Sequence, residues 1–118
     1  MGTWGSGNFD NDYALDYLST VCAPLVDTLA EVVAHPEVAE ADENGGIDSL
    51  VAAEILTNLC RYYYSERLTP ELITNCRDIV LSQWDATIDE LDPKPAYKIE
   101  RRQVMQQTFE RLLVAVQR

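Results

Sequence analysis

The sequence predicts an all-α protein, a single compact bundle of about five helices that follows a glycine-rich N-terminal segment. Apolar residues recur at spacings of three and four, which is the period of one helix face. No segment alternates apolar and polar residues for long enough to indicate a strand. The 118 residues, 47% of them hydrophobic, fit one domain over 1–118 with a core of its own.

The first helical region begins directly after the glycine-rich segment. Asp10 or Asn11 is predicted to cap its start, because either side-chain oxygen can accept a backbone N–H of the first turn. Pro24 interrupts the apolar stripe of this region, since proline lacks an amide donor and clashes with the preceding turn. We therefore expect either one sharply kinked helix or two helices, over about 11–22 and 24–34. The stripe consists of Leu15, Leu18, Cys22, Leu25, Leu29 and Val32.

An acidic loop is predicted over residues 36–47, where Gly45 and Gly46 close it. The next helix is expected over about 48–63, with Asp48 as its N-terminal cap. The predicted buried face of this helix consists of Val51, Ala52, Ile55, Leu56, Leu59 and Tyr63.

Two long helices complete the predicted bundle, over about 70–90 and 96–117. The first of them has a threonine cap, a proline at its first position and an acid in its first turn, at Thr69-Pro70-Glu71. Its predicted buried residues are Leu72, Ile73, Cys76, Ile79, Val80, Trp84 and Ile88. Those of the last helix are Tyr97, Val104, Met105, Thr108, Phe109, Leu112 and Val116.

The net charge of −11 lies entirely in the first half of the chain. Residues 1–60 contain eleven acids and no lysine or arginine, whereas residues 61–118 contain nine acids and nine bases. An acidic half of this kind repels nucleic acid and anionic membranes. It attracts a basic protein and accelerates their encounter at low salt. The charge therefore predicts a basic protein partner, with no binding of nucleic acid or membrane.

The sequence also predicts a cytoplasmic location. It has no run of about 18 apolar residues that predicts a membrane span, and its N-terminus lacks the basic and apolar regions of a secretory signal. Cys22, Cys60 and Cys76 occur singly among apolar residues, without a C-x-x-C pair or the spacing of metal ligands. We expect them to be reduced core thiols, as is usual in the cytoplasm.

The N-terminal segment resembles the start of a bacterial family, the domain-of-unknown-function family 4259. It reads Met1-Gly2-Thr3-Trp4-Gly5-Ser6-Gly7-Asn8-Phe9-Asp10-Asn11-Asp12, and members of that family typically begin Met-Gly-x-Trp-Gly-x-Gly-x-Phe-x-Asn-Asp. Ala52-Ala53-Glu54-Ile55 is similar to the Ala-Ala-Glu-Val helix of the same family. The resemblance implies a small, mostly helical domain and supplies no established activity.

The motif residues have a structural interpretation. The glycines allow the lead over residues 1–10 to pack on the bundle, with Trp4 and Phe9 folded back as apolar anchors. Asn11 and Asp12 lie at the start of the first helix, where Asp12 suits the positive helix end. Glu54 is either a buried carboxylate that accepts hydrogen bonds from the lead or the Trp4 indole, or a catalytic or metal-binding acid. We prefer the structural interpretation, because no second catalytic group accompanies Glu54.

The sequence supports neither a calcium site nor a catalytic site. The segment over residues 40–48 resembles a calcium loop, but position twelve, which requires a bidentate acid, is Val51. The single histidine, His35, precedes a proline at a helix end, and neither a nucleophile elbow nor a phosphate-binding glycine loop is present. The sequence therefore predicts no metal, no cofactor and no enzyme, and a hydrolase stays only as a minor alternative.

The function that the charge favours is an immunity or inhibitor protein that neutralises a basic toxin such as a nuclease. In this hypothesis the acids stand in for phosphate groups, while a tyrosine supplies anchor area at the interface. A small helical adaptor or a self-associating protein is the alternative, and the oligomeric state stays open. The predicted partner-binding residues are Glu37, Glu40, Asp42, Glu43, Asp48, Tyr62 and Tyr63.

Overall fold

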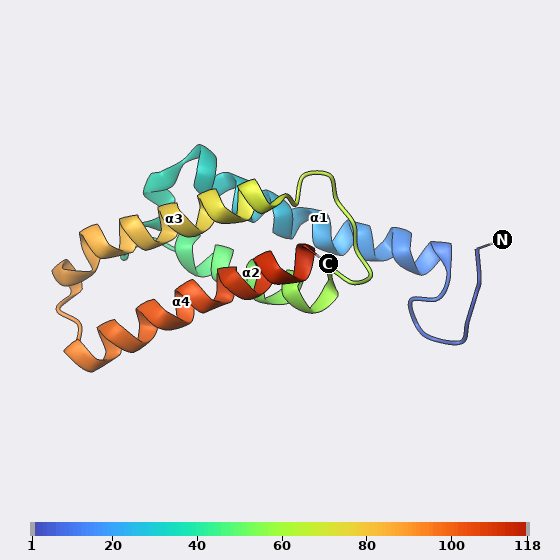
Figure 1. The fold of residues 1–118 in the computed structure, drawn as a ribbon. Coiled ribbons are helices and arrows are strands. Elements are labelled where there is room, and N and C mark those ends of the chain that lie inside the picture. Colours follow the sequence, from blue (N-terminus) through green and yellow to red (C-terminus); the bar gives the residue numbers. More distant parts are fainter. Residues whose placement is uncertain (1, 118) are drawn as a thin grey trace.

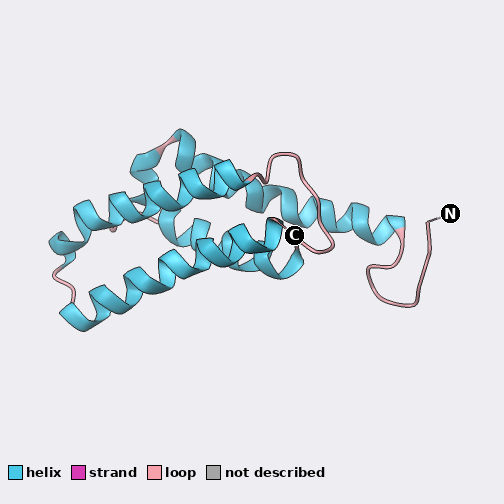
Figure 2. Ribbon diagram, in the orientation of Figure 1, coloured by secondary structure: helices cyan, strands magenta, loops and turns pink. Residues whose placement is uncertain are grey.

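The computed structural model describes residues 2–117, and these residues form an all-α protein (Figures 1 and 2). The elements in chain order are α1 (Asp12–Ala34), η1 (Pro36–Ala39), α2 (Gly45–Leu59), α3 (Pro70–Thr87), η2 (Ile88–Leu91) and α4 (Pro95–Val116). The prediction of an all-α fold is confirmed. The described residues contain four α-helices and two short 3-10 helices rather than five α-helices.

Helix α1 runs without a break through Pro24, so the alternative of two helices is wrong. Asn11 caps the helix, because its Oδ1 accepts the backbone N–H of Ala14 at 2.8 Å. Pro24 cannot donate to the carbonyl of Thr20, but both residues are exposed on the outer face of the helix. Water can therefore solvate the carbonyl that proline leaves unpaired, and the helix continues.

Helix α2 begins at Gly45, three residues before the predicted start, so Asp48 lies in its first turn and does not cap it. Asn44 is the N-terminal cap residue and makes no side-chain cap hydrogen bond. A Cβ atom on Gly45 would lie 2.5 Å from the carbonyl oxygen of Val38. Glycine therefore allows the start of α2 to pack directly against η1.

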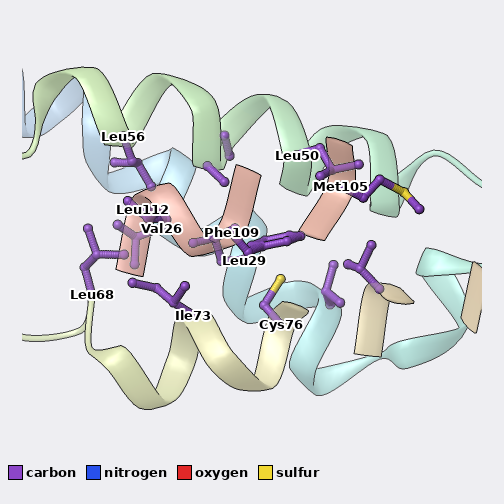
Figure 3. Close-up of a cluster of buried hydrophobic side chains, with 14 of the residues drawn as sticks. Val26, Leu29, Leu50, Leu56, Leu68, Ile73, Cys76, Met105, Phe109 and Leu112 are labelled. Atoms are coloured by element: carbon purple, nitrogen blue, oxygen red, sulfur yellow. The ribbon is translucent and has the colours of Figure 1, made fainter. Parts of the chain in front are cut away.

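The core lies between the four helices, with α1 and α4 each packed against both α2 and α3. Figure 3 shows side chains from all four helices directed into one cluster around Phe109. The predicted core residues that are buried are Leu18, Cys22, Leu29, Val32, Ala52, Leu56, Tyr63, Ile73, Cys76, Val80, Trp84, Ile88, Met105, Thr108, Phe109 and Leu112.

The predicted buried face of α2 is partly wrong. Val51 and Ile55 are 53% and 37% exposed, whereas Leu50 and Ala53 are buried. Since α2 lies between α1 and α4, its buried face is centred on the small residues that allow both neighbours to approach. On α4, Tyr97 and Val104 are likewise exposed, contrary to prediction; the pattern alone did not distinguish these apolar residues from the core.

The glycine-rich lead over residues 2–10 folds on itself and contacts the bundle through Phe9. The Trp4 N–H donates to the Asp10 carbonyl at 2.9 Å, and the Asp12 N–H donates to the Gly2 carbonyl at 2.8 Å. Trp4 is 57% exposed, so its prediction as a buried anchor is wrong. Phe9 does pack against the core cluster. Hydrogen bonds within the lead and the packing of Phe9 together hold this segment in place.

The molecule is elongated, with extents of 56 × 27 × 20 Å. Its radius of gyration is 16.1 Å, compared with about 13.5 Å for a compact domain of this length. Figure 1 shows the reason: the N-terminal half of α1 extends beyond the ends of α2 and α4, and the lead lies at its tip.

Helix α1 is also long and apolar enough, by length and composition, to cross a membrane. The core helix of a folded protein satisfies the same criteria. Here α1 supplies five buried residues to the core, namely Leu18, Cys22, Val26, Leu29 and Val32. These belong to the 28% of its 18-residue apolar window that is buried in the bundle.

Candidate partner-binding site

The predicted partner-binding residues lie at the two opposite ends of α2 (Figure 1). The acidic residues precede or begin this helix, and Tyr62 and Tyr63 follow its last turn. A helix of 15 residues is about 22 Å long. The structure therefore does not bring the acids and the tyrosines together, and each end is a separate candidate site.

The first candidate is the acidic surface, which we define as Glu37, Glu40, Asp42, Glu43 and Asp48. Four of them are exposed, and Glu40 is half-buried. Within residues 2–117, none of them forms an ion pair with a lysine or arginine; Glu37 lies 3.7 Å from Nδ1 of His35 and pairs with it only when the imidazole is protonated. The negative charge of this surface is therefore free to act on another molecule.

Five arginines and lysines of residues 2–117 form ion pairs with other acids. Lys98 and Arg102 of α4 pair with Asp89 and Asp85 at 2.7 and 2.8 Å, and Arg67 pairs with Asp27 of α1 at 2.6 Å. These pairs neutralise acids of α1, α3 and η2 rather than the acidic surface.

A cavity of about 270 Å³ opens beside the acidic surface. Glu40 and Glu43 line it together with one base, Arg101. Its remaining walls are largely apolar and include Ile47, Leu50, Trp84, Ile88, Leu91, Tyr97 and Met105. Carboxylates beside apolar walls suit a side chain with an aliphatic stem and a cationic end. The sequence did not predict this cavity. Trp84 and Tyr97 were expected in the core, and nothing in the sequence indicated that Arg101 lies near the acidic loop.

The acidic surface is held in place by backbone hydrogen bonds. The Ala41 N–H donates to Oγ1 of Thr87 at the end of α3, at 2.8 Å. The Glu43 N–H donates to the Glu40 carbonyl at 2.9 Å. The first of these bonds joins the loop before α2 to a distant helix, and the second closes a turn within the loop. The backbone that carries the carboxylates therefore needs little ordering when a partner binds.

The second candidate is the tyrosine groove, a half-open cavity of about 1000 Å³ at the other end of α2. We define it by Arg61, Tyr62, Tyr64, Leu68, Arg111 and Val114, which are among its lining residues. Tyr63 also lines it but is only 9% exposed, so it offers little surface to a partner. Tyr64, which the prediction omitted, is 83% exposed.

Tyr62 attaches the N-terminal lead to the bundle. Its ring stacks on Phe9, with 4.4 Å between the ring centroids and 25° between the planes. The Arg61 guanidinium lies 4.9 Å from the centroid of the same ring. Both contacts of the Tyr62 ring are thus within its own chain, and 36% of its surface stays exposed.

Glu54 is exposed, so its prediction as a buried acid bonded to the lead or to Trp4 is wrong. Its Oε1 lies 3.4 Å from Nη2 of Arg111. The pair connects α2 to α4 on the surface, where such pairs contribute about 0–1 kcal/mol.

The cysteines are free thiols, and two of them belong to the core. Burial raises the pKa of the Cys76 thiol to about 12, against a smaller opposing effect of a hydrogen bond from Ser49. Burial also raises the pKa of Cys22. Thiols of this kind stay protonated and unreactive at neutral pH. Within residues 2–117, no three histidine, cysteine or acidic side chains are grouped as metal ligands.

Comparison with known proteins identifies the family. No curated protein and no solved structure matches the chain. A family model described as Domain of unknown function (DUF4259) matches residues 2–116, which is nearly the whole sequence. The match extends beyond the N-terminal motif and includes all four helices. The chain therefore belongs to the DUF4259 family.

Proposed function

We propose that this protein is a non-enzymatic binding protein of the cytoplasm that neutralises a basic protein, such as a toxin nuclease, in the manner of an immunity protein. One observation carries the proposal: the acidic surface has five carboxylates without a lysine or arginine partner in the described chain, and two of them, Glu40 and Glu43, line a cavity with largely apolar walls. The partner is a protein whose active site is built to bind phosphate.

The proposed mechanism is direct coverage of the phosphate-binding residues. Glu40 and Glu43 occupy the positions of phosphate charges, and a lysine or arginine of the partner inserts its aliphatic stem between Trp84 and Tyr97. The surrounding acids accelerate the encounter without adding much to the final affinity. Catalytic groups of this protein take no part.

The test is a capture experiment with matched variants. The bait is the protein with Glu40→Gln, Asp42→Asn and Glu43→Gln, compared with wild type in lysate of the native host. A control carries Glu31→Gln, Glu66→Gln and Glu71→Gln, which changes the net charge equally at exposed acids outside the acidic surface. Captured proteins are identified by mass spectrometry, produced separately and measured for binding and for nuclease activity.

The expected result is a basic protein that wild type and control bind equally and that the first variant binds at least tenfold more weakly. Stoichiometric addition of wild type should abolish its nuclease activity. An acidic partner, or equal binding by all three baits, would show that the acidic surface is not the binding site. A basic partner without nuclease activity would support the acidic surface as the binding site but would contradict the proposal that the partner is a toxin nuclease.

A further inference from the structure

The N-terminal half of α1 carries an apolar stripe that no part of the described chain covers. Tyr13, Tyr17 and Val21 are 81%, 64% and 44% exposed, and their spacing of four places them along one face of the helix. Leu18 and Cys22, on the other face, belong to the core. We call residues 12–21 the α1 arm. A contiguous row of large exposed apolar side chains marks an interaction surface.

The tyrosine groove opens at the same end of the molecule as the α1 arm. The stacking of Phe9 on Tyr62 places the start of α1 next to the lining of the groove. Tyr64 and Val114 on the groove are 83% and 59% exposed. The protein therefore has an exposed apolar helix face and an exposed apolar groove side by side, each without an occupant in the described chain.

The charges of the two surfaces are complementary. Helix α1 contains four acids and no lysine or arginine, and two of these acids, Asp12 and Asp16, belong to the α1 arm. The groove contains two bases, Arg61 and Arg111, against one acid, Glu110, and Arg111 is already paired with Glu54 of α2. Arg61 has no acidic partner within residues 2–117; its guanidinium lies over Tyr62. An acidic helix with an apolar face is thus the kind of ligand that the groove suits.

The α1 arm cannot enter its own groove, because its opposite face is fixed in the core by Leu18 and Cys22. A second copy can supply the arm instead. We propose that the protein forms a symmetric homodimer in which the α1 arm of each copy lies in the tyrosine groove of the other. Tyr13, Tyr17 and Val21 then contact Tyr64 and Val114, and Asp16 faces Arg61.

Two-fold symmetry satisfies both contacts at once, as closed dimers require. The elongated shape favours it, because the arm already extends past the bundle on which it would otherwise pack (Figure 1). The acidic surface lies at the far end of α2, so dimerisation leaves it free. The inference is independent of the function proposed above.

The first test measures the mass of the purified full chain by sedimentation equilibrium at about 5 to 500 μM. The expected mass is twice the 13.3 kDa of the chain at the higher concentrations. Tyr17→Glu and Tyr64→Glu should each weaken the dimer at least tenfold. Ile99→Glu is the matched control, since Ile99 is 64% exposed and belongs to neither surface. All variants alter exposed residues, and circular dichroism verifies that each is folded.

A wild-type monomer at every concentration would overturn the proposal, as would larger open-ended oligomers. So would a dimer that Tyr17→Glu and Tyr64→Glu leave intact. A dimer that Ile99→Glu weakens equally would place the interface elsewhere.

The second test exchanges the charges. Asp16→Arg and Arg61→Glu should each give a monomer, because like charges then meet in both arm–groove contacts. An equimolar mixture should form a heterodimer, since one contact is then wild type and the other has its charges reversed. A mixture that stays monomeric while wild type dimerises would overturn the pairing of these two surfaces.

Discussion

Trp4 and Phe9 lie five residues apart in the same glycine-rich motif, yet only Phe9 has a structural partner. Phe9 stacks on Tyr62 and packs against the core cluster, whereas Trp4 points into solvent from a lead that closes on itself. Hydrogen bonds join residues 2–4 to residues 10–12, and in this arrangement Trp4 stays exposed while Phe9 reaches Tyr62.

Phe9→Ala is therefore expected to lower the free energy of unfolding by about 1–2 kcal/mol, a fraction of the cost at a fully buried phenylalanine. Trp4→Ala should change it by less than about 0.5 kcal/mol, as is usual for an exposed side chain. Urea denaturation of both variants measures the two values. A larger loss for Trp4→Ala than for Phe9→Ala would mean that the lead packs differently.

Cys76 gives a prediction about pH. Its pKa rises from 9.0 to about 12 on burial, so the folded thiol keeps its proton where the unfolded thiol loses it. The stability that this represents is complete well below pH 9, and it declines as the pH rises through 9 toward the folded pKa. Between pH 8 and 10 the unfolded thiolate should lower the free energy of unfolding by about 1 kcal/mol. Cys76→Ala should remove that part of the decline, and an unchanged pH profile would contradict the assignment.

At the scale of elements, the starts of α3 and α2 are set in two different ways. Thr69 caps α3 by accepting the N–H of Leu72 at 3.1 Å, as its sequence context predicts. The start of α2 has no such local cap and depends instead on Gly45 lying against Val38. A boundary of this second kind is set by tertiary packing.

Gly45 and Gly46 are a matched pair that tests this explanation. Gly45→Ala should destabilise the protein by about 1–3 kcal/mol, because its Cβ would lie 2.5 Å from the Val38 carbonyl oxygen. In Gly46→Ala the new Cβ would lie 3.6 Å from its nearest neighbour, the Ala39 carbonyl oxygen. This substitution should be neutral or should stabilise the protein by up to about 1 kcal/mol, because alanine has the higher helix propensity. Thermal unfolding distinguishes the two. If both substitutions were tolerated equally, η1 would not be held against α2 as described.

At the scale of the whole molecule, the acidic half and the engaged bases give the protein a surface of one dominant sign. Arg67 and Arg111 reach back from the second half of the chain to Asp27 and Glu54, but the acidic surface keeps its full charge. The apolar surfaces of the α1 arm and the tyrosine groove lie at the other end. The two ends are therefore suited to different kinds of partner.

The rate of association with a basic partner should fall at least tenfold as salt rises from about 50 to 500 mM, because screening acts on charges beyond about 3–10 Å. The dissociation rate should change much less, since it depends on the packed contacts in the cavity. Stopped-flow or surface-based kinetics measures both rates. An association rate independent of salt would exclude electrostatic steering by the acidic surface.

The fold class and most of the core followed from sequence because they depend on local periodicity. Leu18, Cys22 and Leu29 on α1 and Met105, Phe109 and Leu112 on α4 recur at helical spacing, and burial of that face is the strongest term in folding. The cap residues Asn11 and Thr69 could also be predicted from sequence, because the side-chain oxygen of a cap accepts a backbone N–H only three residues away.

Tertiary structure alone decided the continuity of α1, the buried face of α2 and the separation of the acids from the tyrosines. Pro24 is tolerated because its side of the helix faces solvent, and Val51 and Ile55 are exposed because two neighbours approach α2 over its small residues. The sequence by itself determined the acidic charge and the helical class of this protein. Where the charges act was decided by packing, because the length and direction of α2 set one group of residues about 22 Å from the other.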